Sequence, residues 1–422
     1  MKRIFISCVA MALLSGMALA GNITPGVRSG DIWTKKRDQM ANAGFNGVRY
    51  ASIDDNSIRV PRNGGLQLDG LELGETIVTW NAEGILSNMV TMLYNKGDDG
   101  AISQEEYTKL LQNTIKALNE LTGVEGKPRR SSQREAGVPL KIWVWEWDGG
   151  VIRMEASYTG GSRRTTFEAE FIRLRMGASQ EAVTAGGASN AANRRELRTN
   201  VKRDEESGDV WIDGVNMVDQ GDKGYCVPAT VARVFAYYGM DGVDQHALAQ
   251  LCDSSADGGT STAAMQTALE SISRRFHIRI QSLDGRTATD SIMSLIEDYN
   301  KAARRLRRPM ATPQNWIEVT RDREVLLAAR GSKRAVRRWF NAMKKSIDAG
   351  IPVLWSVELG IFPEAGIPQA SGGHMRMIIG YNEKSETIYY SDSWGAGHER
   401  KSMPMNQASA ITRNRYILRP SR

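Results

Sequence analysis

Four side chains that lie far apart in the sequence have the chemistry of a thiol-based active site: Gln220, Cys226, His374 and Asp392. A thiol becomes a strong nucleophile near neutral pH only as its thiolate. A helix N-terminus or a nearby imidazolium lowers its pKa. Cys226 follows the glycine-containing residues 220–224 and opens an apolar helical pattern, so it should lie at a helix N-terminus. His374 is expected to supply the imidazolium.

Two neighbouring predicted strands should bring His374 and Asp392 together. His374 opens the run HMRMIIGYN, and Asp392 lies at the end of the next predicted strand, TIYYSDSW. If the two strands pair as a hairpin, Asp392 lies beside His374, hydrogen-bonds its far ring nitrogen and fixes its tautomer. Gln220 precedes the turn that presents Cys226. Its amide and the Cys226 backbone N–H are therefore candidates for stabilising an oxyanion.

The stretches QGDKGYCVPA, GGHMRMIIGYN and SDSWGAG resemble those of papain-fold cysteine peptidases of the C39-like type. The resemblance covers roughly residues 210–420 and implies an α+β domain, with helices first and an antiparallel sheet after them. It further implies that Cys226 is the nucleophile, His374 the general base, Asp392 the orienting residue and Gln220 the oxyanion-hole donor. DSWG is similar to the NSWG of papain, and Asp in place of Asn agrees with the C39 branch.

The remaining cysteines and histidines lack such a context. Cys252 is predicted to be a core residue, and His246 and His277 to be core or surface residues. His398 is close to Asp392 in sequence but stands in a polar loop, so it ranks below His374. Only two cysteines follow residue 20 and no C-x-x-C motif is present, so we expect no structural zinc site and no cofactor.

The first 20 residues have the features of a secretory signal peptide. Lys2 and Arg3 precede a short apolar core, and Ala18-Leu19-Ala20 forms an A-x-A cleavage pattern before Gly21. We therefore expect a periplasmic or extracellular protein. No later run approaches 18 consecutive apolar residues, so no transmembrane segment is expected.

The charge balance argues against a dedicated nucleic-acid binder. Removing Lys2 and Arg3 lowers the net charge from +7 to +5, which is a small excess for a chain of this length. We expect a peptide or protein as the substrate, and the oligomeric state is left open. At roughly 150 residues per domain, the mature chain should hold two or three domains.

The hydrophobic patterns divide the chain into two predicted domains. Residues 21–176 should form a mixed N-terminal domain of unknown function, with a helix over 104–121 and a hairpin over 141–158. Residues 177–208 are small, polar and charged, which is typical of a linker. Residues 209–422 should form the peptidase-like domain.

Three other patterns admit two interpretations each. The stretch NKGDDGAISQEEY partly matches a calcium-binding loop, but Ser103 and Glu106 also fit a helix capping box. The face of Trp143, Trp145 and Trp147 favours a core over a sugar or peptide site. The basic residues of 304–345 favour a solvated helix over a site for an acidic polymer.

The sequence thus predicts an exported cysteine peptidase that hydrolyses peptide or amide bonds through Cys226, His374 and Asp392. Two alternatives remain open. An amine in place of water would make the protein an acyltransferase or transpeptidase with the same triad. Loss of catalysis would leave a papain-fold binding protein. The N-terminal domain is expected to restrain or direct the catalytic one.

Overall fold

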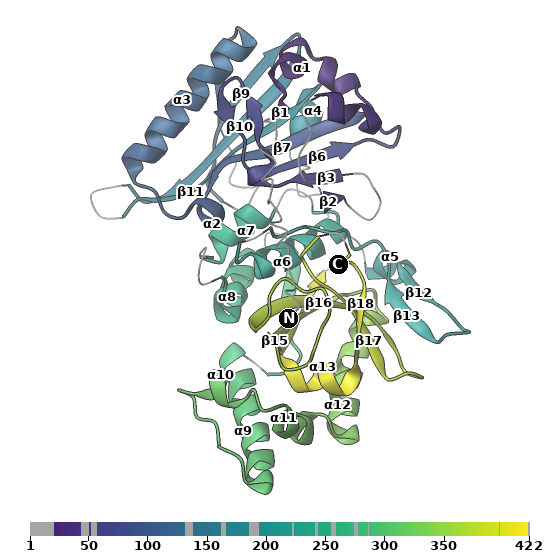
Figure 1. The fold of residues 1–422 in the computed structure, drawn as a ribbon. Coiled ribbons are helices and arrows are strands. Elements are labelled where there is room, and N and C mark those ends of the chain that lie inside the picture. Colours follow the sequence, from purple (N-terminus) through teal and green to yellow (C-terminus); the bar gives the residue numbers. More distant parts are fainter. Residues whose placement is uncertain are drawn as a thin grey trace, which may run out of the picture.

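The computed structural model describes residues 21–43, 50–51, 57–130, 138–161, 166–184, 194–221, 223–240, 244–254, 259–273, 277–285, 287–395 and 397–420. The predicted signal peptide lies outside these residues. They form a mixture of helices and strands arranged around two eight-stranded sheets, one in each half of the chain (Figure 1). Among the described residues, no helix is both long and apolar enough to cross a membrane.

The N-terminal region (residues 21–184) is built on an antiparallel sheet with the strand order β2-β3-β6-β7-β11-β10-β9-β8. The bounds of these strands are β2 Tyr50–Ala51, β3 Ser57–Val60, β6 Thr76–Trp80, β7 Leu86–Asn95, β8 Lys127–Arg130, β9 Lys141–Trp147, β10 Gly150–Thr159 and β11 Glu168–Gly177. A small sheet of β1 (Gly21–Asn22), β4 (Leu66–Leu68) and β5 (Leu71–Glu72) lies beside it, with the short helices α1 (Thr24–Ser29), α2 (Lys96–Asp99) and α4 (Gln180–Val183).

The predicted helix over 104–121 is present as α3 (Gln104–Thr122). Its N-terminus is held by the expected capping box, in which Ser103 and Glu106 exchange side-chain and backbone hydrogen bonds. The carboxylate of Glu106 is thereby committed to the helix end. The hairpin prediction is also confirmed, because β9 and β10 pair through the turn at Asp148-Gly149.

The tryptophan face of β9 belongs to the core, as the sequence pattern favours. Trp145 is fully buried, and its indole Nε1 donates a hydrogen bond to Asn119 Oδ1 of α3 at 2.7 Å. Trp143 and Trp147 pack against the same hydrophobic cluster. The opposite face of the sheet, including Ile142 and Phe171, joins a buried cluster that also contains residues of the C-terminal region.

The segment 177–208, expected as a polar linker, contains regular structure in its described part. Val183 of α4 is buried, and α5 (Arg194–Thr199) buries Leu197. The strand β12 (Val201–Arg203) then pairs with β13 (Asp209–Ile212) at the edge of the C-terminal sheet. Isolated apolar residues among many polar ones are enough to anchor short elements on an existing core, which composition alone does not reveal.

The C-terminal region (residues 194–420) places most of its helices before its main strands, as the α+β prediction requires. The helices are α6 Cys226–Tyr237, α7 Gln245–Leu251, α8 Thr262–Ser273, α9 Ala288–Leu306, α10 Trp316–Val319, α11 Arg323–Arg330, α12 Lys333–Ile347 and α13 Met405–Ile411. The remaining strands are β14 Ile278–Ser282, β15 Val353–Leu359, β16 Gly372–Asn382, β17 Thr387–Ser391, β18 Lys401–Pro404 and β19 Thr412–Pro420. The sheet order is β12-β13-β16-β15-β19-β14, with β17 paired to β16 and β18 to β17.

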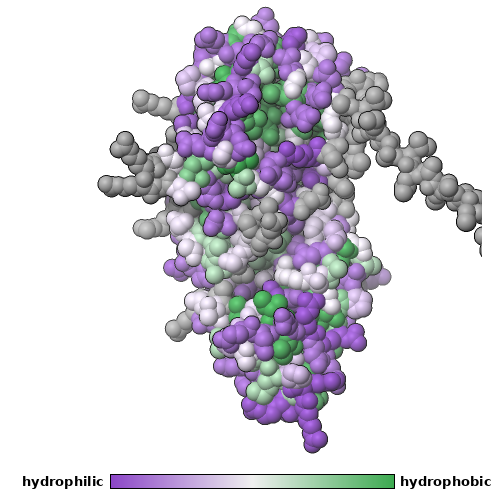
Figure 2. Space-filling model, turned by 60° about the vertical axis from the view of Figure 1, so that its left-hand side comes forward, coloured by the Kyte–Doolittle hydropathy of each residue, from purple (hydrophilic) through white to green (hydrophobic). Residues whose placement is uncertain are grey.

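The helices α9 to α12 lie at the end of the molecule farthest from the N-terminal sheet (Figure 1). The basic helix α12 buries Trp339, Phe340, Met343 and Ile347 on one face and exposes basic side chains on the other. Hydrophilic side chains cover much of this end of the molecule (Figure 2). The basic segment therefore has the solvated helical face that the sequence favours.

Candidate active site

Cys226 is the first residue of α6, as the sequence predicts. Tyr225 occupies the N-cap position, and its side chain makes no capping hydrogen bond with the described residues. The N–H groups of the first turn therefore remain available to a negative charge on the sulfur. Pro228 lies in that first turn, where a missing N–H costs little. Cys226 is a free thiol and is partly exposed.

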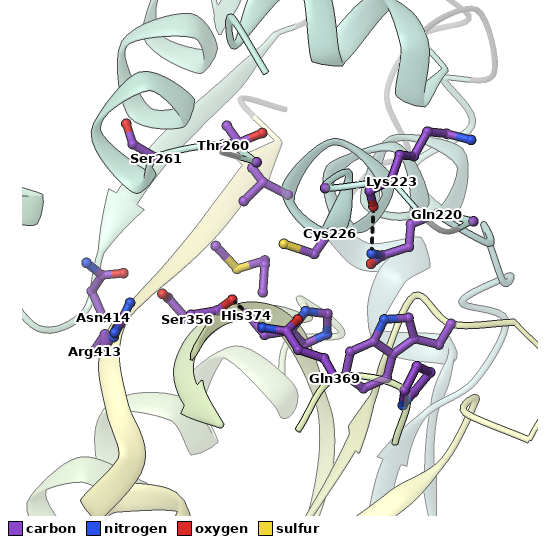
Figure 3. Close-up of a pocket in the computed structure, with 18 of the residues that line it drawn as sticks. Gln220, Lys223, Cys226, Thr260, Ser261, Ser356, Gln369, His374, Arg413 and Asn414 are labelled. Carbon is purple, nitrogen blue, oxygen red and sulfur yellow. Dashed lines mark hydrogen bonds between the residues drawn. The ribbon is translucent and has the colours of Figure 1, made fainter. Parts of the chain in front are cut away.

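His374 and Asp392 meet through the strand pairing that the sequence predicts. His374 lies near the start of β16, and Asp392 directly follows β17, which pairs antiparallel with β16. The ring Nε2 of His374 lies 3.0 Å from Asp392 Oδ1. This bond leaves Nδ1 for Cys226, which approaches the imidazole from α6 on the other wall of the cleft (Figure 3).

The thiol and the imidazole change each other's pKa. Burial opposes ionisation of Cys226, but its interaction with the nearby His374 imidazole, together with backbone hydrogen bonds, holds the pKa of Cys226 below its usual value. Burial also disfavours the imidazolium, but the hydrogen bond to Asp392 and the interaction with the Cys226 thiol raise the pKa of His374 above its usual value. Both directions favour a thiolate–imidazolium pair near neutral pH.

Asp392 is fully buried behind His374 and is held from two sides. Burial raises the pKa of its carboxyl, but His374 and Arg376 outweigh this and keep that pKa low. Arg376 Nε donates to Asp392 Oδ1 at 2.9 Å. From α6, the buried Arg233 donates to the Asp392 backbone carbonyl at 2.9 Å and to Ser391 Oγ at 2.6 Å. The helix that carries Cys226 thus also holds Asp392.

Gln220 lies in the same cleft as Cys226 and His374. Its Nε2 donates to the Lys223 backbone carbonyl at 3.0 Å, and its Oε1 accepts a hydrogen bond from Ser393 Oγ at 2.8 Å. Figure 3 shows the amide beside Cys226, with the bond to Lys223 drawn as a dashed line. The amide has a second N–H, so it has a donor left for a substrate oxygen.

The cleft extends well beyond these side chains and has a volume of about 1090 Å³. On one side it is lined by Trp316, Ser356, Arg413 and Asn414, which come from α10, β15 and β19. Asn414 is nearly fully buried, and its Oδ1 has no hydrogen-bond partner among the described residues. A cleft of this volume, lined by both apolar and polar groups, lies at the upper end of the range for ligand-binding pockets.

Trp394 completes the site in a way that the sequence reasoning missed. Its indole stacks on the His374 ring, with the ring centroids 4.1 Å apart and the planes 10° from parallel. An aromatic face stabilises a cation that lies over it, so this stack favours the imidazolium. The signal was present in the sequence, because Trp394 is part of the DSWG motif, but the motif alone gave it no role.

Replacing Trp394 with alanine is expected to lower the pKa of His374. The loss of a cation–π contact worth about 0.5–2 kcal/mol corresponds to a fall in the His374 pKa of about 0.4–1.5 units. The alkaline limb of the activity profile should move to lower pH by that amount, so activity should fall most on the alkaline side of the optimum. Trp394→Phe, which keeps an aromatic face, is the control. An unchanged alkaline limb in Trp394→Ala would show that the stack has no influence on the imidazolium.

The other cysteine and histidines occupy positions outside the Cys226–His374–Asp392 arrangement. Cys252 is a buried free thiol whose pKa burial raises to about 12, as expected for a core residue. His246 is buried against Tyr225. His398 reaches the edge of the cleft and contacts Trp394, and its backbone carbonyl accepts a hydrogen bond from the Asp392 N–H. Its pKa is lowered, chiefly by burial, so it is a weaker base than His374.

Comparison with known protein families gives one match, to the model described as the Peptidase_C39 like family, over residues 212–418. This range contains all four site residues predicted from the sequence and omits the N-terminal region. No curated protein matches the chain.

Proposed function

Residues 212–418 belong to the Peptidase_C39 like family, and from this premise we propose that the protein is a cysteine peptidase that hydrolyses peptide or amide bonds. The observation that carries the proposal is the arrangement of Cys226 at the start of α6 beside an imidazole that is hydrogen-bonded to a buried carboxylate. A structural cysteine needs neither the helix N-terminus nor the histidine.

In the first half of the reaction, the Cys226 thiolate attacks the substrate carbonyl carbon and the carbonyl becomes a tetrahedral oxyanion. The Cys226 backbone N–H and the free N–H of Gln220 donate to this oxygen. The carbon–nitrogen bond then breaks, the His374 imidazolium gives its proton to the departing amine, and a thioester on Cys226 remains. Asp392 holds the ring of His374 in place throughout.

In the second half, water attacks the thioester and gives its proton to His374. The second tetrahedral oxyanion collapses, the carboxylic acid leaves and the Cys226 thiolate is restored. An amine in place of water would give acyl transfer through the same intermediates. Mass spectrometry of products formed in H₂¹⁸O distinguishes the two, because only hydrolysis places ¹⁸O in the new carboxyl group.

Native-state alkylation tests whether Cys226 is a nucleophile. Iodoacetamide at pH 6 should modify Cys226 at least about tenfold faster than it modifies a model thiol, because the pKa of Cys226 is held low. Cys252 should react only after denaturation, because burial raises its pKa to about 12. If Cys226 also required denaturant, the protein would be a non-catalytic binding protein that keeps the fold.

We also propose that the protein is exported to the periplasm or beyond the cell, on the strength of its first 20 residues. The mature chain should then begin at Gly21, which N-terminal sequencing of the secreted protein checks. A mature chain that retains Lys2 and Arg3 would contradict this. We place the boundary between an N-terminal domain and the peptidase domain within residues 177–208 and ahead of Val201, because β11 of the first large sheet ends at Gly177 and β12 of the second begins at Val201.

A further inference from the structure

The N-terminal region contacts the loop that carries Gln220. We define the Gln220 loop as residues 219–225, of which residue 222 lies outside the described residues. The Gln220 amide is held at both ends, by Ser393 Oγ on its oxygen and by the Lys223 carbonyl on its nitrogen. The Gln220 N–H also donates to the Ser393 carbonyl at 2.8 Å. The position of the amide therefore depends on where the backbone of Lys223 lies.

The side chain of Lys223 is committed to the N-terminal region. It is fully buried, and its ammonium pairs with Glu75 and lies 3.2 Å from Asp98 of α2. Neither carboxylate belongs to the segment that matches the family. A buried ammonium is tolerated only when it is paired, so these two acids fix where Lys223 lies.

A second ion pair holds the start of the loop. Arg59 of β3 lies 3.3 Å from the Asp219 carboxylate and 3.5 Å from Glu75. Gln245 of α7 donates to the Asp219 carbonyl at 3.1 Å and contacts Glu75 at 3.4 Å. Glu75 therefore interacts with three donors that surround the Gln220 loop: Lys223, Arg59 and Gln245.

The ion-pair cluster leaves no room for a side chain at Gly221 of the Gln220 loop. Its φ is +72°, and a Cβ at this position would lie 2.6 Å from Arg59 Nη2 and 3.1 Å from Lys223 Nζ. Only glycine adopts this φ without strain and also clears the ion-pair cluster. At the end of the loop, Tyr225 packs against Gly97 of α2 so closely that a Cβ there would lie 2.5 Å from the ring.

We propose that Glu75, Asp98 and Arg59 position the Gln220 loop for oxyanion stabilisation, so that the N-terminal region supplies part of the catalytic geometry from outside the family segment. This inference rests on the proposed function. Of the two roles expected for the N-terminal region, it favours directing the active site over restraining it. Glu75, Asp98 and Arg59 are positioning residues, because they act through Gln220 and Lys223.

Two reagents that react with the Cys226 sulfur distinguish a loss of oxyanion stabilisation from a general loss of folding or of thiol reactivity. Acylation of Cys226 by 4-nitrophenyl acetate passes through an oxyanion, whereas alkylation by iodoacetamide is a displacement at a saturated carbon and forms none. In full-length Glu75→Gln, acylation should slow by about 10-fold to 100-fold while alkylation stays within about twofold of wild type. Gln220→Ala is the reference for a lost donor and should slow acylation by about 10²-fold to 10³-fold.

Lys223→Met is a second test, because it removes the ammonium that pairs with Glu75 and Asp98. Acylation should slow in this variant too, while alkylation stays near the wild-type rate. Arg62→Met is the matched control, because Arg62 pairs with Asp99 beside the cluster but is half exposed, and it forms no ion pair with the described residues of the Gln220 loop. Equal acylation rates in Glu75→Gln, Lys223→Met and wild type would overturn the inference, and so would an equal fall in acylation and alkylation. A wild-type protein that reacts with neither reagent would instead refute the proposed function.

Discussion

Cys226→Ala should lose hydrolysis almost completely, by a factor on the order of 10⁶ if the site behaves as other nucleophile–base pairs do. The variant has no sulfur to form the thioester, and His374 and Gln220 on their own provide only a modest residual acceleration of hydrolysis. Because the substrate is unidentified, the measurement compares the products that wild type and variant form from a proteome-derived peptide library, read by mass spectrometry.

Cys252→Ala is the matched control for this prediction. It removes the other described cysteine, which is buried and lies outside the cleft. The change should lower stability slightly, by about 1 kcal/mol, because it removes a small buried group and leaves a small cavity. Its product pattern should be that of wild type. Retention of the wild-type pattern in Cys226→Ala would show that the thiol is not the nucleophile.

Asp392→Ala is expected to have the second largest effect, a loss of activity on the order of 10³-fold to 10⁴-fold. Asp392 raises the pKa of His374 and holds its ring. Without it the imidazolium is less stable, so the pKa of His374 falls and that of Cys226 rises. The pH range over which the thiolate–imidazolium pair exists should therefore narrow from both sides.

The pH range of the thiolate–imidazolium pair is measured from the pH dependence of iodoacetamide labelling and of hydrolysis. Glu364→Gln is the control, because Glu364 Oε2 lies 2.8 Å from Arg376 Nη1 but is not a partner of His374. Both variants leave Arg376 with a poorer buried partner, so both should lower stability, by up to about 3–5 kcal/mol. Only Asp392→Ala should alter the two limbs of the profile. Identical profiles for the two variants would show that Asp392 does not tune His374.

The parts of the site that local patterns encode were predictable. The start of α6 at Cys226 follows from a turn-rich stretch before an apolar helical repeat. The meeting of His374 and Asp392 follows from two consecutive strands, because neighbours in sequence commonly form a hairpin. The presence of Gln220 in the cleft was predicted from its place before the same turn.

The parts that depend on distant partners were not predictable. Lys223 is an ordinary polar loop residue in the sequence, and only the fold shows that Glu75, far upstream, neutralises it. Arg376 and Arg233 were likewise not recognised, because a buried arginine is identified by its acceptors and not by its own position. The helix α9 begins with a capping box formed by Thr287 and Asp290, a local signal that the sequence does carry.

The contact from Arg233 to the Asp392 carbonyl also bears on when the protein becomes reactive. It joins residues 159 positions apart, so it forms only after Asp392 has been synthesised. Contacts of such high sequence separation are slow to form during folding. On a chain that is synthesised from its N-terminus, α6 and Cys226 emerge long before Asp392 and β19. A partly made chain therefore carries an ordinary thiol with neither base nor orienting carboxylate. The topology therefore delays assembly of the Cys226–His374–Asp392 arrangement until Asp392 has been synthesised.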